Sequence, residues 1–306
     1  MNVISLFSGA GGLDLGFVQA GFNIIWANDN DKYAYRTYTM NFGNHMILGD
    51  INTIDENTIP LGDVVIGGFP CQPFSMMGAE KGFKDPRGTV FFRIIEIIKN
   101  QIERGNIPQV IVLENVRRLL THDSGYTFKT VVHELENIGY NVYYKVLNTA
   151  NYGIPQTRNR IFIVCFKDKV NFEFPTEIKL ENTMQDLLEE NVEEKYFLSE
   201  KILPTILSNG SGNYKAKSEI DLQIARPLCS TMHKMHRACQ DNYVTNNGRI
   251  RRLTPREAAR LQGFPDDFII PVSDTQAYRQ FGNAVTVKVA YEVARSILRS
   301  LNHNEE

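Results

Sequence analysis

The stretch that decides the fold is Val3-Ile4-Ser5-Leu6-Phe7-Ser8-Gly9-Ala10-Gly11-Gly12, at residues 3–12. It begins with an apolar run typical of a strand, continues through a glycine-rich turn, and precedes a helical pattern at residues 13–20. This order begins a nucleotide-type α/β unit, because missing side chains let a ligand approach the backbone. The turn does not follow the GxGxxG pattern and no Walker lysine follows it. We therefore expect an adenosine-bearing cofactor rather than a dinucleotide or triphosphate, with a purely structural turn as the alternative.

Strands and helices continue to alternate along the first half of the chain. We expect strands at residues 22–27, 64–67, 109–113, 142–147 and 161–166, a strand that closes at residues 49–51, and helices at residues 32–40, 91–99 and 127–138. Such alternation predicts an α/β fold with a mostly parallel, doubly wound sheet. Ligands bind at the carboxyl ends of the strands in these sheets, so functional residues are expected there.

Two of these strand ends carry a carboxylate suited to an adenosine. Asp29 follows the second strand, where it could accept both hydroxyls of a ribose, although it could equally cap the helix at residues 32–40. Asp50 follows the third strand and could accept the adenine amino group, with Ile51 covering a face of the ring. These positions predict the adenosine end of the cofactor site.

The segment Gly67-Gly68-Phe69-Pro70-Cys71-Gln72-Pro73-Phe74-Ser75 follows the fourth strand and contains the candidate nucleophile, Cys71. Pro70 and Pro73 restrict their own φ angles and the residues before them, so Cys71 sits on a stiffened turn. A thiolate nucleophile benefits from that rigidity. A buried structural thiol is the alternative. The glycine-bearing loop at residues 76–89 is predicted to be a lid.

Another strand end brings an acid and two cations to the same edge of the sheet. Glu114 ends the strand at residues 109–113, with capping of the next helix as its alternative role. Arg158 and Arg160 lie in a basic turn before the last strand and could grip a phosphate or a carbonyl, or could simply be solvated. We therefore expect Cys71 and Glu114 at one site.

The chain changes in character after residue 175. Residues 181–194 are acidic and are predicted to be helical, whereas residues 201–260 contain 11 Lys or Arg against 4 Asp or Glu. This local excess of positive charge suits contact with phosphates. The region also contains Cys229, His233, His236 and Cys239, whose spacing does not match paired zinc-binding hooks, so no metal is predicted. Thr254 is predicted to cap a helix that begins at Pro255.

Composition limits the class of protein. The 306 residues suffice for a large core, and the net charge of -2 gives the chain as a whole no bias toward polyanions. Four cysteines without a CxxC pair do not suggest a disulfide framework, which favours a reducing, intracellular location. The first residues are interpreted as a strand rather than a signal peptide, and no apolar run is long enough to predict a membrane span.

Taken together, these motifs resemble those of the cytosine-C5 DNA methyltransferases, especially the single-chain modification methylases of restriction systems. Eight matches occur in the family's order between residues 3 and 286: FSGAGG, the acidic strand tip at Asp29, GDI, GGFPCQPFS, ENV, QTRNR, RRLTPREAARLQGFP and GNAV. The stretch without a match, residues 176–248, is where the family keeps its variable target-recognition domain. The family often has glutamate in place of Asp29 and an aromatic residue in place of Asn30.

The resemblance implies roles for particular residues. The implied catalytic residues are Cys71 as nucleophile, Glu114 as partner of the base, and Arg158 and Arg160. The implied S-adenosyl-L-methionine residues are Phe7, Ser8, Gly9, Ala10, Gly12, Asn28, Asp29, Asp50, Ile51, Pro70, Asn283 and Ala284. The implied DNA-binding residues are Gln72, Ser75, Arg87, Arg226, Lys234, His236 and Arg237.

The resemblance also implies a fold and an activity. The fold would be the Rossmann-like class I methyltransferase fold, with a catalytic domain at residues 1–175 and 264–306 and a target-recognition domain at residues 176–263. A monomer in the bacterial cytoplasm would methylate C5 of a flipped-out cytosine in double-stranded DNA, protecting it from a restriction endonuclease with which it forms no stable complex. A tRNA cytosine-C5 methyltransferase is the alternative, against which stand the basic segment and the lack of a Cys-Phe-Thr tripeptide. A DNA-binding module without catalysis is disfavoured by the presence of Cys71 and Glu114.

Overall fold

The chain forms two compact units. The computed structural model describes residues 1–69, 89–208, 210–211, 214–215, 219–234, 236–237 and 239–302. The first unit comprises Met1–Leu147, Asn159–Thr176 and Val289–Glu306, and the second comprises Asn148–Arg158 and Glu177–Lys288. The second unit thus takes in residues 148–158 and 264–288, which the sequence prediction placed in the catalytic domain.

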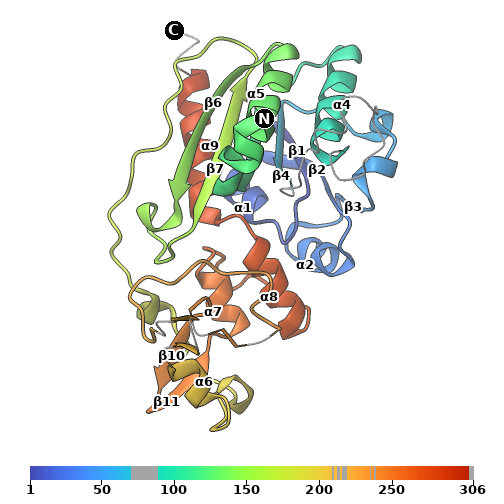
Figure 1. Ribbon diagram of the computed structural model, residues 1–306. Coiled ribbons are helices and arrows are strands. Elements are labelled where there is room, and N and C mark those ends of the chain that lie inside the picture. Colours follow the sequence, from blue (N-terminus) through green and yellow to red (C-terminus); the bar gives the residue numbers. More distant parts are fainter. Residues whose placement is uncertain are drawn as a thin grey trace. The chain divides into compact units, whose positions relative to one another are not determined.

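The first unit is built on one seven-stranded sheet (Figure 1). Its strands are β1 Asn2–Leu6, β2 Asn23–Asp29, β3 Met46–Leu48, β4 Val64–Gly68, β5 Val110–Val116, β6 Asn141–Asn148 and β7 Asn159–Phe166, in the order β3-β2-β1-β4-β5-β7-β6. All pairs from β3 to β5 are parallel, and β7 pairs antiparallel with β5. The predicted α/β class and mostly parallel, doubly wound sheet are therefore confirmed.

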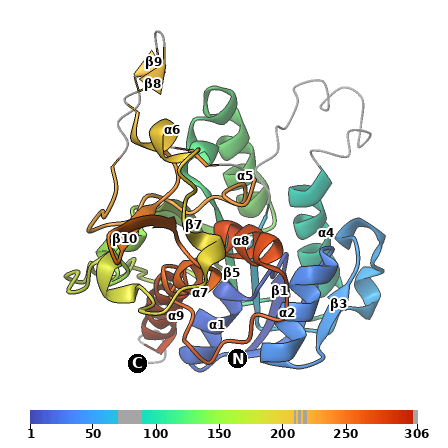
Figure 2. The ribbon, with the colours of Figure 1, turned by 90° about the horizontal axis from the view of Figure 1, so that it is seen from below.

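Helices cover both faces of this sheet (Figures 1 and 2). They are α1 Gly12–Gln19, α2 Lys32–Phe42, α4 Thr89–Glu103, α5 Tyr126–Asn137 and α9 Val287–Asn302. Helices α4 and α5 pack on one face, where side chains such as Ile94 and Val131 join Ile4, Val65 and Ile111 in one buried cluster. Burial of this apolar surface is the main stabilising term for the unit.

The order of the strands places the predicted cofactor turn beside the predicted nucleophile loop. The order of the strands reverses between β1 and β4, with β2 and β3 on one side of this pair and β5 on the other, and Leu6 is paired with Gly67. The chain leaves β1 into residues 7–12 and leaves β4 toward Cys71, from the same edge of the sheet. Such a switch point is where open α/β sheets bind ligands.

The second unit has little regular structure. It contains helices α6 Leu203–Leu207, α7 Pro255–Arg260 and α8 Asp274–Asn283, and strands β8 Gly210–Ser211, β9 Tyr214–Lys215, β10 Tyr243–Asn246 and β11 Arg249–Arg252. Strands β10 and β11 form a hairpin around Asn247 and Gly248, both with positive φ, as a tight Asn-Gly turn requires. The predicted cap is confirmed, because Thr254 accepts a hydrogen bond from the Glu257 N–H at the start of α7.

The predicted helix at residues 181–194 is wrong. The 3₁₀ turn Met184–Leu187 forms there instead, the backbone is extended at Leu188, and a second 3₁₀ turn, Glu194–Tyr196, begins at the last residue of the range. The neighbouring acids would repel one another on a helix, and Glu189 instead bonds through its N–H to the Glu257 carboxylate. Long-range contacts with α7 thus replace the local helical bonds.

The described part of the chain contains no helix that is both long enough and apolar enough to cross a membrane.

Candidate active site

The glycine turn after β1 leaves room for a ligand. Phe7 and Gly9 have φ angles of 55° and 57°, and a Cβ added to Gly9 would meet nothing within 4 Å. Gly11 serves packing instead, because a Cβ there would lie 2.3 Å from the Phe42 ring. The left-handed conformation is costly for Phe7, and such strain is often retained at binding sites. The predicted cofactor residues Ser8, Ala10 and Gly12 are buried in the same turn.

Asp29 lies directly against this turn. One carboxylate oxygen accepts the Gly9 N–H at 2.9 Å and the other accepts the Asp31 N–H at 2.8 Å. The helix-cap alternative for Asp29 is wrong, because Asp31 caps α2 by accepting from Tyr33 and Ala34. Burial raises the pKa of the Asp29 carboxyl. Asp29 therefore ties the tip of β2 to the glycine turn, and its oxygens retain lone pairs for further donors.

Asn28 holds the next strand end in place. Its side-chain amide donates to the carbonyls of Ile47 and Gly49, both at 3.0 Å, and is 1% exposed. Asp50 follows directly and is exposed, with one oxygen accepting from the Asn52 N–H. Ile51 is only 3% exposed and belongs to the core cluster. Asn28 thus acts on the predicted cofactor site through the backbone that carries Asp50.

Replacing Asn28 should weaken cofactor binding without changing the rate of the bound complex. Asn28→Ala leaves two buried carbonyls without donors, so the loop before Asp50 should shift. We expect the dissociation constant for S-adenosyl-L-methionine to rise about tenfold, as measured by calorimetry. Asn100→Ala, which removes a surface bond to Asn57, is the control. Unchanged binding in a folded Asn28→Ala protein would contradict this role.

The ends of β4 and β5 bring Glu114 beside the segment that leads to Cys71. Gly68 is paired with Glu114 across the two strands, and Cys71 follows Gly68 by three residues. The Glu114 carboxylate forms an ion pair with the Arg160 side chain at 3.1 Å, with side chains 9% and 20% exposed. Glu114 lies within β5, so the helix-cap alternative is wrong. Glu114 of the ENV motif and Arg160 of the QTRNR motif are therefore in direct contact in the structure.

Several predicted residues lie outside the described part of the chain. These are Pro70, Cys71, Gln72, Ser75 and Arg87, together with the predicted lid at residues 76–89 except Thr89, which begins α4. Their predicted roles stay predictions.

Asn115 is a residue of this site whose role was not predicted. Its buried side-chain amide donates to the Phe69 carbonyl at 2.9 Å, and its oxygen accepts the Val116 N–H. Phe69 is the last described residue before the Cys71 loop. Asn115 thus fixes where that loop begins relative to Glu114. Its place in the ENV string was the available signal, but the acceptor is 46 residues away.

Arg158 occupies a structural position within the second unit. It is 1% exposed and its guanidinium donates to the carbonyls of Leu228, Gly282 and Ala284 at 2.9–3.1 Å. Arg158 thus connects the backbone at Leu228 to the backbone around the predicted cofactor residues Asn283 and Ala284. Asn283 itself is exposed. Arg158 therefore has a bracing role in the second unit, and the catalytic role predicted for it stays a prediction.

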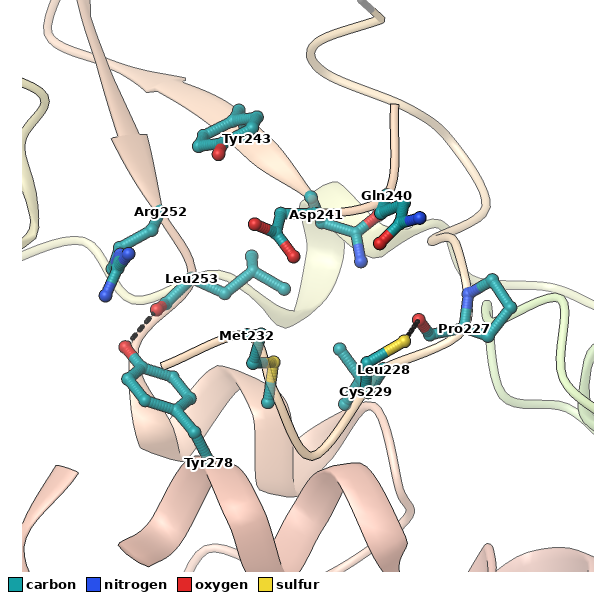
Figure 3. Close-up of a pocket in the computed structure, with 11 residues that line it drawn as sticks. Pro227, Leu228, Cys229, Met232, Gln240, Asp241, Tyr243, Arg252, Leu253 and Tyr278 are labelled. Atoms are coloured by element: carbon teal, nitrogen blue, oxygen red, sulfur yellow. Dashed lines mark hydrogen bonds between the residues drawn. The ribbon is translucent and has the colours of Figure 1, made fainter. Parts of the chain in front are cut away.

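The second unit contains a small pocket in the same part of the chain as the predicted DNA-binding residues (Figure 3). Arg226 forms an ion pair with Glu219 at 3.2 Å, and Arg237 forms one with Asp241 at 2.8 Å. Apolar and aromatic side chains line the pocket, among them Leu228, Met232, Leu253, Tyr243 and Tyr278. Arg226 and Arg237 therefore both form ion pairs within residues 219–241, and these pairs stabilise the conformation of that segment.

The other two predicted DNA-binding residues of this segment, Lys234 and His236, differ in their exposure and contacts. Lys234 is exposed, whereas His236 lies 3.2 Å from the Arg252 guanidinium and beside the Tyr243 ring. Burial and the Arg252 charge lower the pKa of His236. Among the described residues, no three His, Cys, Asp or Glu side chains are grouped so that they could share a metal ion.

Comparisons with known proteins agree with this geometry. The family model described as C-5 cytosine-specific DNA methylase matches residues 1–299. The chain is 43% identical over 312 residues to the Type II methyltransferase M.NgoBI of Neisseria gonorrhoeae, covering 97% of this chain and 92% of the relative. It is 42% identical over 318 residues to M.SsoII of Shigella sonnei, covering 98% and 81%.

The fold is also found among solved structures. The S. pombe Dnmt2 methyltransferase superposes with a TM-score of 0.80 at 23% identity, covering 99% of both chains. This similarity concerns the fold alone. Since the family model and the relatives cover nearly the whole sequence, the chain belongs to the C-5 cytosine-specific DNA methylase family.

Proposed function

We propose that this enzyme transfers a methyl group from S-adenosyl-L-methionine to C5 of a cytosine within a specific double-stranded DNA sequence. The observation that carries the proposal is the Glu114–Arg160 ion pair, which lies beside the strand leading to Cys71. This strand neighbours the one that ends in the glycine turn. A carboxylate, a thiol and a cofactor turn on adjacent strand ends are what methylation of a pyrimidine carbon requires.

The residues of the first unit fit the cofactor. Gly9 faces open space, so the turn can approach a ligand without a clash. Asp29 can accept the ribose hydroxyls and Asp50 the adenine amino group, since Asp29 ends β2 and Asp50 follows the end of β3. When bound, S-adenosyl-L-methionine supplies the electrophilic methyl group of its sulfonium.

The side chains around Glu114 account for activation of the base. Cytosine C5 is a poor nucleophile, so the Cys71 thiolate adds to C6 and converts the ring into an enamine. Glu114 hydrogen-bonds N3 and the amino group, so negative charge does not accumulate on the ring. Arg160 holds the Glu114 carboxylate in position. Once C5 of the enamine carries the methyl group, loss of the C5 proton and departure of the Cys71 sulfur from C6 restore the aromatic ring.

The substrate and partners follow from this chemistry. A stacked base is inaccessible from either face, so the target cytosine is flipped out of the duplex. The second unit, with the exposed Lys234, contacts the DNA and acts as the target-recognition domain. The methylation protects bacterial DNA in the cytoplasm from a restriction endonuclease with which this monomeric enzyme forms no stable complex.

A competition assay tests the proposal against a tRNA substrate. Purified enzyme is given radiolabelled S-adenosyl-L-methionine with a mixture of random-sequence duplex DNA and total tRNA. We expect label in the DNA as 5-methylcytosine, with Cys71→Ser as the inactive control. Label confined to the tRNA, or label on another atom of the base, would overturn the proposed function.

A further inference from the structure

A chain of buried side chains runs beneath the glycine turn. The Ser5 hydroxyl donates to the Asp14 carboxylate at 2.7 Å, and the Tyr38 hydroxyl donates to its other oxygen at 2.6 Å. The Ser5 and Ser8 hydroxyls lie 2.8 Å apart, and the Tyr38 hydroxyl lies 3.1 Å from His45 Nε2. Residues from β1, the turn, α1, α2 and the β3 approach thus form one network around Asp14.

The carboxylate at its centre fixes the direction of every bond. A hydroxyl has one hydrogen, and that of Ser5 is given to Asp14, so the bond between the two serines must be donated by Ser8. Ser8 also lies 3.3 Å from the Ser5 carbonyl, which is a second acceptor on the same side. By the same argument His45 donates to Tyr38. The Ser8 hydrogen therefore points toward Ser5, and the Ser8 oxygen retains lone pairs for a further donor.

We propose that Asp14 is a positioning residue that orients the Ser5 and Ser8 hydroxyls, so that Ser8 offers a hydrogen-bond acceptor to the ammonium group of the cofactor's amino-acid end. The inference rests on the proposed cofactor site. An ammonium group has only donors, so an oxygen whose own hydrogen is already committed is a suitable partner. Ser8 is 9% exposed and lies next to Gly9, where the turn is open.

The free-energy cost of burying the charged Asp14 carboxylate supports a functional role for this residue. Asp14 is 0% exposed, and burial raises its pKa to about 6, with hydrogen bonds from Tyr38 and Ser5 opposing the rise. The titratable or charged groups facing it are Tyr38, His45 and Asp29, none of which is a permanent cation. Because the folded-state pKa lies above the usual value, stability falls as pH rises toward 6, and an amide would avoid this loss. A neutral residue would be the more stable choice.

The test measures how strongly the protein recognises the amine. Calorimetry at pH 8 compares S-adenosylhomocysteine with its deaminated analogue, so that the sulfonium charge plays no part. In the wild type we expect the amine to improve the affinity roughly tenfold, as for a hydrogen bond to a charged group. Asp14→Asn should lose most of this ratio, because an amide can donate toward Ser5 and reverse the chain. Below pH 6 the wild-type ratio should fall, and that of the variant should stay flat.

Two further variants make the outcome decisive. Ser5→Ala keeps the charge but removes the link to Ser8, and should lower the ratio as Asp14→Asn does. Asp168→Asn, on an exposed acid of the same unit, should leave the ratio unchanged. The proposal is overturned if the ratio stays at the wild-type value in Ser5→Ala, or in a folded Asp14→Asn protein. A wild-type protein that binds neither compound would instead overturn the proposed function.

Discussion

Glu114→Gln should lower the rate of methyl transfer by about 10² to 10⁴-fold while the affinity for S-adenosyl-L-methionine is retained. The amide keeps the shape of the side chain, but it is neutral. It therefore cannot stabilise a protonated N3 as the negatively charged carboxylate does. It also loses the charge that pairs with Arg160 at 3.1 Å. Addition of the thiol to C6 would then leave negative charge on the ring, so the loss should appear in the chemical step.

The measurement is a single-turnover experiment with saturating duplex DNA and cofactor. Glu136→Gln, on the exposed side of α5, is the matched control and should react at the wild-type rate. A Glu114→Gln enzyme with more than about one tenth of the wild-type rate would exclude the role assigned to this carboxylate.

Arg251→Met should destabilise the second unit by about 3–5 kcal/mol. Arg251 and Glu257 are both 0% exposed and pair through two bonds of 2.7 and 2.8 Å. The Glu257 carboxylate also accepts the N–H groups of Glu189 and Thr254, so it connects three segments of the unit. Removing Arg251 leaves this carboxylate buried without its cation, which costs far more than the pair itself contributes.

Urea unfolding, followed by fluorescence and circular dichroism, measures the change. Arg249→Met is the matched control on the same strand, because its pair with Glu194 is 53% and 76% exposed and is screened by solvent, so its loss should change stability far less. The double variant Arg251→Met with Glu257→Met should recover part of the loss, since no buried charge remains. Equal effects of Arg249→Met and Arg251→Met would contradict the assigned importance of burial.

Local sequence patterns predicted the sheet well. The strand that ends at Leu6 and the strand that ends at Gly68 were identified from short apolar runs, and their parallel pairing follows from the helices between them. Because the carboxyl ends of parallel strands share an edge, the proximity of the glycine turn, Asp29 and Glu114 could be expected from the order of elements alone.

The roles of individual polar residues could not be predicted in the same way. The bracing role of Arg158 could not be predicted, because the carbonyls that it binds lie 70 to 126 residues away in the sequence. The Asp14 network likewise depends on Tyr38, 24 residues away. The helix predicted at residues 181–194 was wrong for a related reason. There, long-range contacts of Glu189 with Glu257 and Thr254 outweigh the local helix propensity.

The most direct test of the proposed chemistry uses duplex DNA in which 5-fluorocytosine replaces the target cytosine. If Cys71 attacks C6 and the methyl group is added at C5, fluorine blocks the final elimination, so enzyme and DNA should remain joined. Denaturing electrophoresis should then show an adduct that needs S-adenosyl-L-methionine and is absent with Cys71→Ser. An active enzyme that gives no denaturant-resistant adduct, or gives one with Cys71→Ser, would contradict covalent activation of the base by Cys71.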